Sequence, residues 1–131
     1  MLGAPERTHE FKLAVPAHPK SLRIVRQAVK GLGEIFGEEV VNTLAMIYSE
    51  LVTNAIRHAG IRRGATLEVQ LEAGPETIKG RVTDPGQGFD PATIPAPRPD
   101  QEDGFGLRIV DRLAAHWGVR RNGQTEVWFE L

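Results

Sequence analysis

With 131 residues, 40% of them hydrophobic and 25% charged, and a formal net charge of −1, the chain has the composition of one globular domain and no electrostatic footprint for nucleic acid. It lacks cysteine, which excludes disulfides and thiolate metal sites, and neither a signal-peptide core nor a run of membrane-spanning length is present. We therefore expect a cytoplasmic protein without a membrane partner, with a single domain over residues 1–131 and an ordered core over residues 9–131.

The first half of the chain predicts one strand and two helices. Apolar and polar residues alternate over residues 9–15, which is the period of a half-buried strand. An apolar stripe with three- and four-residue steps covers residues 22–36 and predicts a helix that stops at Gly37. A second helix is expected over residues 38–59, because acidic residues suit its start and Gly60 is a natural C-terminal cap.

A hairpin and an irregular segment are expected next. Residues 66–72 alternate cleanly, and residues 77–83 pair back on them after a turn at residues 74–76. Residues 90–103 contain four prolines and several acidic residues, so regular structure is not expected there.

The last part of the chain predicts a helix and two closing strands. The helix begins at Gly104, and its apolar positions continue at helical spacing as far as Trp117. Residues 118–121 and 125–130 are expected to be strands around Asn122-Gly123, a strong hairpin signal. The order β-α-α-β-β-loop-α-β-β predicts an α+β two-layer sandwich, with about three helices on one face of a mixed, mostly antiparallel sheet.

Glu50 and Asn54 form a polar pair in the second predicted helix. They lie four residues apart, so their side chains share one face of the helix. A carboxylate and a carboxamide beside an apolar face suit a site that polarises a hydroxyl group and holds a hard cation. By itself such a pair is more often part of a solvated helix face, so its meaning depends on the rest of the chain.

Two glycine-containing segments add further features of a ligand site to the pair of Glu50 and Asn54. Asp84 ends a predicted strand and is a fixed acceptor for an exocyclic amine such as that of adenine. Gly86 and Gly88 follow it and allow a ligand to approach the backbone closely. Gly104 and Gly106 leave the first amides of the third helix uncovered, where phosphate is attracted. Each segment alone fits an ordinary turn or helix start, but the three elements in this order predict a nucleotide site.

These motifs resemble those of the gyrase and histidine-kinase ATPase superfamily, which has the Bergerat ATP-binding fold. Residues 50–55 resemble its N box, residues 84–89 its first glycine box and residues 104–110 its second. The small size, the entry strand with two helices, and the N-box form over residues 54–59 are most similar to one branch. That branch is the bacterial anti-sigma factor serine/threonine protein kinases.

The resemblance implies that the chain binds ATP and Mg²⁺, with Asn54 on the metal and Glu50 as the general base for a serine hydroxyl. The protein substrate would be an anti-sigma factor antagonist, the other partner a sigma factor, and a homodimer is a family expectation. Residues 90–103 take the place of the ATP lid, and Thr125 takes that of a hydroxyl near adenine. The implied nucleotide-binding residues are Asn54, His58, Asp84, Gly86, Gly88, Phe89, Gly104, Phe105, Gly106, Leu107 and Thr125.

The lid segment, residues 90–103, keeps an alternative open. It is short and rich in proline, and Arg98 is its only basic residue. This favours a nucleotide-gated anti-sigma or regulatory protein that captures partners without phosphorylating them. An ATPase fragment of a larger machine is the third and weakest interpretation, because no transducer segment follows the last predicted strand. His58 follows the N box closely and is assigned a structural or phosphate-contacting role.

Overall fold

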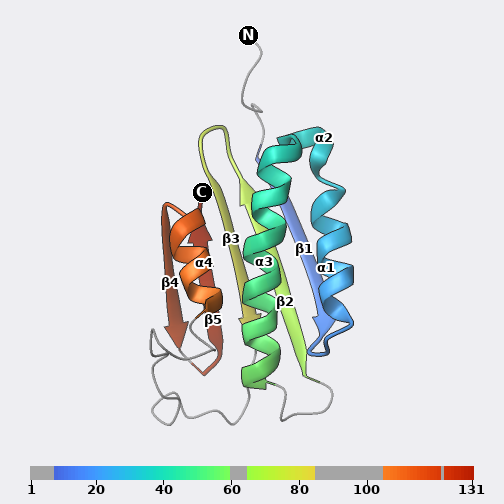
Figure 1. The fold of residues 1–131 in the computed structure, drawn as a ribbon, viewed down its shortest axis with the longest axis vertical. Coiled ribbons are helices and arrows are strands. Elements are labelled where there is room, and N and C mark those ends of the chain that lie inside the picture. Colours follow the sequence, from blue (N-terminus) through green and yellow to red (C-terminus); the bar gives the residue numbers. More distant parts are fainter. Residues whose placement is uncertain (1–7, 60–64, 85–104, 122) are drawn as a thin grey trace.

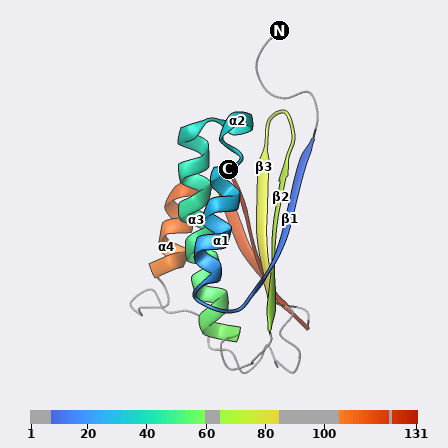
Figure 2. The ribbon, with the colours of Figure 1, turned by 90° about the vertical axis from the view of Figure 1, so that its right-hand side faces the viewer.

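The computed structural model describes residues 8–59, 65–84, 105–121 and 123–131. In these residues the chain forms one sheet, and the helices lie together on one of its faces (Figures 1 and 2). The α+β two-layer architecture expected from the element order is confirmed. Within the described part of the chain, no helix has the length and apolar character needed to cross a membrane.

The sheet is antiparallel throughout its described pairings. Its strand order is β1-β2-β3-β5-β4, so β5 lies between β3 and the edge strand β4. Two of the pairings, β2 with β3 and β4 with β5, join strands that follow one another in the chain, which favours antiparallel hairpins. The sheet is therefore more regular than the mixed one expected. The strands are β1 (His9–Pro16), β2 (Thr66–Ala73), β3 (Ile78–Asp84), β4 (His116–Arg121) and β5 (Thr125–Glu130).

The helix expected over residues 22–36 is wrong in its extent, because it is broken in two. The first part ends at Lys30, where the amide of Gly31 donates to the carbonyl of Gln27, and a separate short helix follows. Glycines on both sides of Leu32 weaken a continuous helix. The helices are α1 (Ser21–Lys30), α2 (Gly33–Phe36), α3 (Glu38–Ala59) and α4 (Phe105–Leu113).

The expectation that the third predicted helix reaches Trp117 is also wrong. α4 ends at Leu113, and Trp117 lies in β4, opposite Phe129 of β5. The amide of Ala115 donates to the carbonyl of Glu130 at 2.8 Å. Pairing with β5 therefore starts almost directly after the helix, and the helical spacing of the apolar residues does not continue it.

The core lies between α3 and the sheet, and Tyr48 is at its centre. Its ring meets that of Phe129 edge to face, with centroids 5.2 Å apart, and its hydroxyl donates to the carbonyl of Gln70 at 2.5 Å. Gly80 lies under both rings, and a Cβ there would overlap the tyrosine hydroxyl and the Phe129 ring. Buried core residues include Val25, Val29, Leu44, Ile47, Leu51, Val52, Leu67, Val69, Val82 and Val110.

The burial of Tyr48 predicts that the folded state loses stability at alkaline pH. Burial raises the pKa of Tyr48 far above its ordinary value. The unfolded chain releases this proton near pH ~10 while the folded chain keeps it, so stability is full below that pH and falls by about 1.4 kcal/mol per pH unit above it. Tyr48→Phe should remove this part of the slope and cost about 1 kcal/mol at neutral pH through the lost hydrogen bond.

Urea unfolding of both proteins from neutral to alkaline pH checks this expectation. Because Tyr48 is the only tyrosine in the chain, the absorbance of tyrosinate reports its ionisation alone. Equal alkaline slopes in the two proteins, or tyrosinate formed while the wild type is still folded, would contradict it.

Candidate functional site

Four segments that carry predicted site residues reach the same end of the molecule. They are the last turns of α3, the end of β3, the start of β5 and the start of α4, all toward the lower end of the view in Figure 1. In the sequence they are spread over more than half of the chain. The antiparallel order of the sheet brings them together, because β5 begins where β3 ends.

Asp84 and Thr125 are direct cross-strand partners at this end. They are paired in the register of β3 with β5, two positions beyond the pair Val82 and Val127. Paired residues project to the same side of a sheet, and side chains alternate along each strand. Gly80 contacts Tyr48 of α3, so Val82, Asp84 and Thr125 project to the helix-covered face. Asp84 is only 3% exposed, which makes it a buried carboxylate beside a hydroxyl group.

Asn54 is a buried amide near the end of α3. It is 8% exposed and follows Ile47 and Leu51 on one helical stripe, both of which are almost fully buried. The apolar stripe holds α3 against the sheet and carries Asn54 into the layer between helices and strands. The last turns of α3 run beside the end of β3 in both Figure 1 and Figure 2. Asn54 and Asp84 are therefore two buried polar groups at the same end of the fold.

Glu50 lies one turn earlier on α3 and is half-buried. It lines a groove of 500 Å³ to which α1, α3 and α4 all contribute. In this groove the Nε of Arg26 donates to the hydroxyl of Ser49 at 2.8 Å and ties α1 to α3 beside Glu50. A carboxylate in an open groove is accessible to a hydroxyl group from another molecule. Arg26 was not among the predicted site residues; its only signal in the sequence is its position outside the apolar stripe of α1.

The remaining predicted residues are only partly described. Leu107 is half-buried in the first turns of α4. Phe105 and Gly106 lie in α4, and His58 lies in α3, but the side chains at these positions are not described. The roles assigned to these residues stay predictions. The predicted positions outside the described residues are Gly86, Gly88, Phe89, Gly104 and the lid segment 90–103.

The described residues suit a metal that is shared with a ligand. Among them, no group of three or more His, Cys, Asp and Glu side chains gathers to hold a metal ion. Mg²⁺ needs only one or two protein oxygens when phosphates and water complete its six ligands. The buried amide of Asn54, in the last turns of α3, is a suitable oxygen of this kind.

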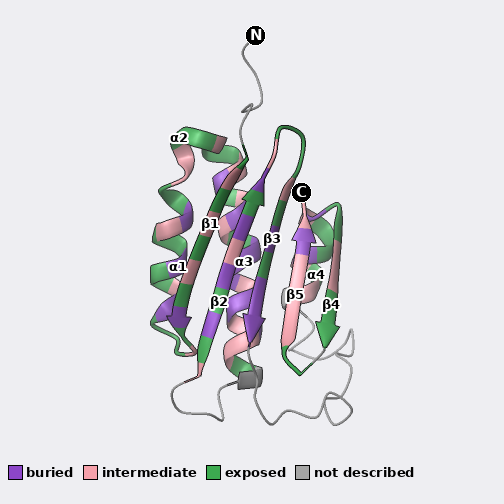
Figure 3. Cartoon of the chain, turned by 180° about the vertical axis from the view of Figure 1, so that it is seen from behind, coloured by how far each residue is buried: buried purple, intermediate pink, exposed green. Residues whose placement is uncertain are grey.

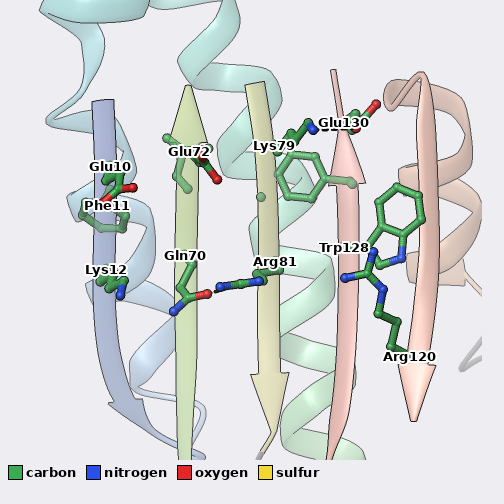
Figure 4. A pocket seen from close by; sticks show the side chains of 13 residues that line it. Glu10, Phe11, Lys12, Gln70, Glu72, Lys79, Arg81, Arg120, Trp128 and Glu130 are labelled. Atoms are coloured by element: carbon green, nitrogen blue, oxygen red, sulfur yellow. Dashed lines mark hydrogen bonds and ion pairs between the residues drawn. The ribbon is translucent and has the colours of Figure 1, made fainter. Parts of the chain in front are cut away.

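A second hollow, of 330 Å³, lies on the face of the sheet that the helices leave open, which is the face toward the viewer in Figure 3. Figure 4 shows the side chains that line it. Charged side chains on this part of the sheet pair across the strands, with Lys79 3.4 Å from Glu130 and Arg120 3.0 Å from Glu126. Arg120 also lies over the ring of Trp128, 5.4 Å from its centroid. None of the predicted site residues lines this hollow, so the candidate site is the end of the helix-covered face.

Comparison with known proteins gives the family and the fold. Residues 15–131 match the family model described as the histidine kinase-like ATPase domain. Among solved structures, the chain is similar to the RsbU and RsbW domains of Rv1364c from Mycobacterium tuberculosis, with a TM-score of 0.65 and 20% identity. That match covers 93% of this chain but only 32% of the other. No match was found among curated proteins.

Proposed function

This chain belongs to the histidine kinase-like ATPase domain family, and from that premise we propose that it is a serine/threonine protein kinase that acts as an anti-sigma factor. It uses ATP with Mg²⁺ and phosphorylates an anti-sigma factor antagonist on serine in a partner-switching circuit. The observation that carries the proposal is the pairing of buried Asp84 with Thr125 at the end of the sheet that Asn54 of α3 also reaches. The whole chain forms the domain that does this.

The described residues divide the work of binding a nucleotide. The carboxylate of Asp84 accepts a hydrogen bond from the amino group of adenine. The hydroxyl of Thr125 lies beside this carboxylate. The amide oxygen of Asn54 is offered to Mg²⁺. The first amides of α4 would hold the phosphates, because the start of a helix attracts an anion. ATP when bound supplies the phosphoryl group.

Glu50 is the group left for the chemistry. Phosphoryl transfer requires mostly positioning and charge neutralisation, together with one group that orients the attacking oxygen and takes its proton. Glu50 lies one helical turn from Asn54 and opens to a groove rather than to the core. Its carboxylate therefore accepts the proton of a serine that is presented from outside.

A protein substrate is supported by three observations. The N-box form over residues 54–59 is that of the anti-sigma factor kinases. The similar solved structure includes a domain named RsbW. A protein serine also fits the open groove at Glu50 better than a site closed around water.

Transfer of labelled phosphate tests the proposal. The full-length protein is incubated with Mg²⁺, γ-labelled ATP and a candidate antagonist protein, and phosphoserine is identified in the product. We expect label on serine only when protein, ATP and Mg²⁺ are all present. A stable complex that depends on nucleotide but contains no phosphoserine would instead support the non-catalytic regulatory protein.

A further inference from the structure

Two neighbouring hollows on the helical face of the molecule share part of their lining. The first, at Glu50, has a volume of 500 Å³, and the second, of 630 Å³, extends toward α2. Lys30 and Asn42 line both hollows, so the two lie next to each other. We call this surface the α1/α3 groove. Its side chains used below are Arg26, Lys30, Glu34, Asn42, Met46 and Glu50.

We propose that the α1/α3 groove binds the substrate segment next to the acceptor serine and selects an acidic side chain about four residues from that serine. The proposal rests on the proposed function, because Glu50 marks where the serine lies. Its occupant is an extended segment of the protein substrate.

The positive side chains of α1 favour an acidic segment of the substrate. Ser21–Lys30 contains Arg23, Arg26 and Lys30 and no acidic residue. Two of these cations line the groove, and both side chains belong to exposed residues. The Nε of Arg26 is used in the bond to Ser49, which fixes that guanidinium beside Glu50. Lys30, one turn further along α1, is the cation that an incoming carboxylate can pair with.

Apolar side chains also line the groove. Met46 is 53% exposed, more than any other large hydrophobic residue among those described, and it lines the groove. Ile109 of α4 lines the groove as well. Together they provide apolar surface for a hydrophobic side chain of the substrate, since a flexible methionine adapts to different partners.

Helical spacing translates these positions into a sequence pattern. Met46 is about 6 Å and Asn42 about 12 Å from Glu50 along α3, at 1.5 Å per residue. An extended peptide advances about 3.3 Å per residue. A serine at Glu50 therefore places the second residue along at Met46 and the fourth near Asn42 and Lys30. Beyond them, Glu34 and Glu38 line the far part of the groove, so the preference for acid ends there.

Binding of designed peptides tests the proposal. The probes are fluorescein-labelled peptides with one serine, a leucine two residues from it, and either aspartate or lysine four residues from it. Each probe is made in both chain directions, because the groove does not define the polarity. Fluorescence anisotropy with the full-length protein gives the affinities. We expect the aspartate probe of one direction to bind about threefold to tenfold more tightly than its lysine partner, as exposed charge pairs allow.

Two charge reversals on α1 complete the experiment. Lys30→Glu should reverse the order of the two probes, whereas Arg23→Glu, on the same helix but outside the groove, should leave the wild-type order unchanged. Both residues are exposed, so the fold is retained. Equal affinities in the wild type, or the same order in Lys30→Glu, would overturn the groove proposal. A change of oligomeric state in Lys30→Glu with unaltered probe affinities would also overturn it, because a second copy would then be the occupant.

Phosphate transfer to the same probes separates this proposal from the function on which it rests. Selective binding without phosphoserine would support the groove proposal and overturn the kinase function. Phosphoserine formed equally on both probes would support the kinase function and overturn the groove proposal.

Discussion

Glu50→Gln should lower the rate of phosphoryl transfer to serine by about 10²–10⁴-fold, which is the usual contribution of a general base. Glutamine has nearly the shape of glutamate but cannot take the proton of the attacking hydroxyl group. Because Glu50 lines the groove and the proposed metal ligand is Asn54, ATP affinity should change little. Initial rates with labelled ATP, together with ATP titration of each protein, measure the two effects separately.

Glu39→Gln is the matched control for this prediction. Glu39 is exposed in the first turn of α3, so the same chemical change is made on the same helix away from the site. Its rate should equal that of the wild type. If Glu50→Gln also transfers phosphate at the wild-type rate, Glu50 is not the base, whatever the chain binds.

Asp84→Asn should weaken ATP binding by about tenfold to 100-fold. The change removes a charged acceptor from a residue that is 3% exposed, and hydrogen bonds to charged groups contribute about 1.5–3 kcal/mol. The choice between nucleotides should change more clearly than the affinity. A carboxylate accepts from the amino group of adenine but repels the carbonyl oxygen of guanine, whereas an amide can donate to that oxygen.

The ratio of ATP to GTP affinity is therefore the decisive measurement for Asp84. We expect a strong preference for ATP in the wild type and a much smaller one in Asp84→Asn. Glu76→Gln, an exposed change in the turn between β2 and β3, is the control that should keep the wild-type ratio. An unchanged ratio in a folded Asp84→Asn protein would show that adenine does not contact this carboxylate.

Much of the fold follows from local patterns in the sequence. The second predicted helix, over residues 38–59, agrees with α3 at both ends, and residues 125–130 agree with β5. The helix has a clear period and a glycine at its end, and the strand follows a strong turn signal. Gly123, in the turn before β5, has a φ of +77°, a conformation that glycine adopts without strain.

The incorrect parts have physical causes that local patterns do not contain. Residues 22–36 have one continuous apolar stripe, yet the glycines at 31 and 33 break the helix after Lys30. Trp117 has the spacing of a helical residue, yet pairing with β5 makes it part of a strand. A helix competes with a strand partner only after the chain has folded back on itself, so the position of that partner decides the outcome.

The sequence by itself determined the kinds of residue at the site, Glu50 and Asn54 on a helix and Asp84 at the end of a strand, because spacing along one element needs no other part of the chain. Only the tertiary structure decided which other parts of the chain these residues meet. The order β1-β2-β3-β5-β4 puts Thr125 opposite Asp84, and the packing of α1 on α3 builds a groove at Glu50. Those contacts join residues far apart in the chain, and their pairing depends on how whole layers pack.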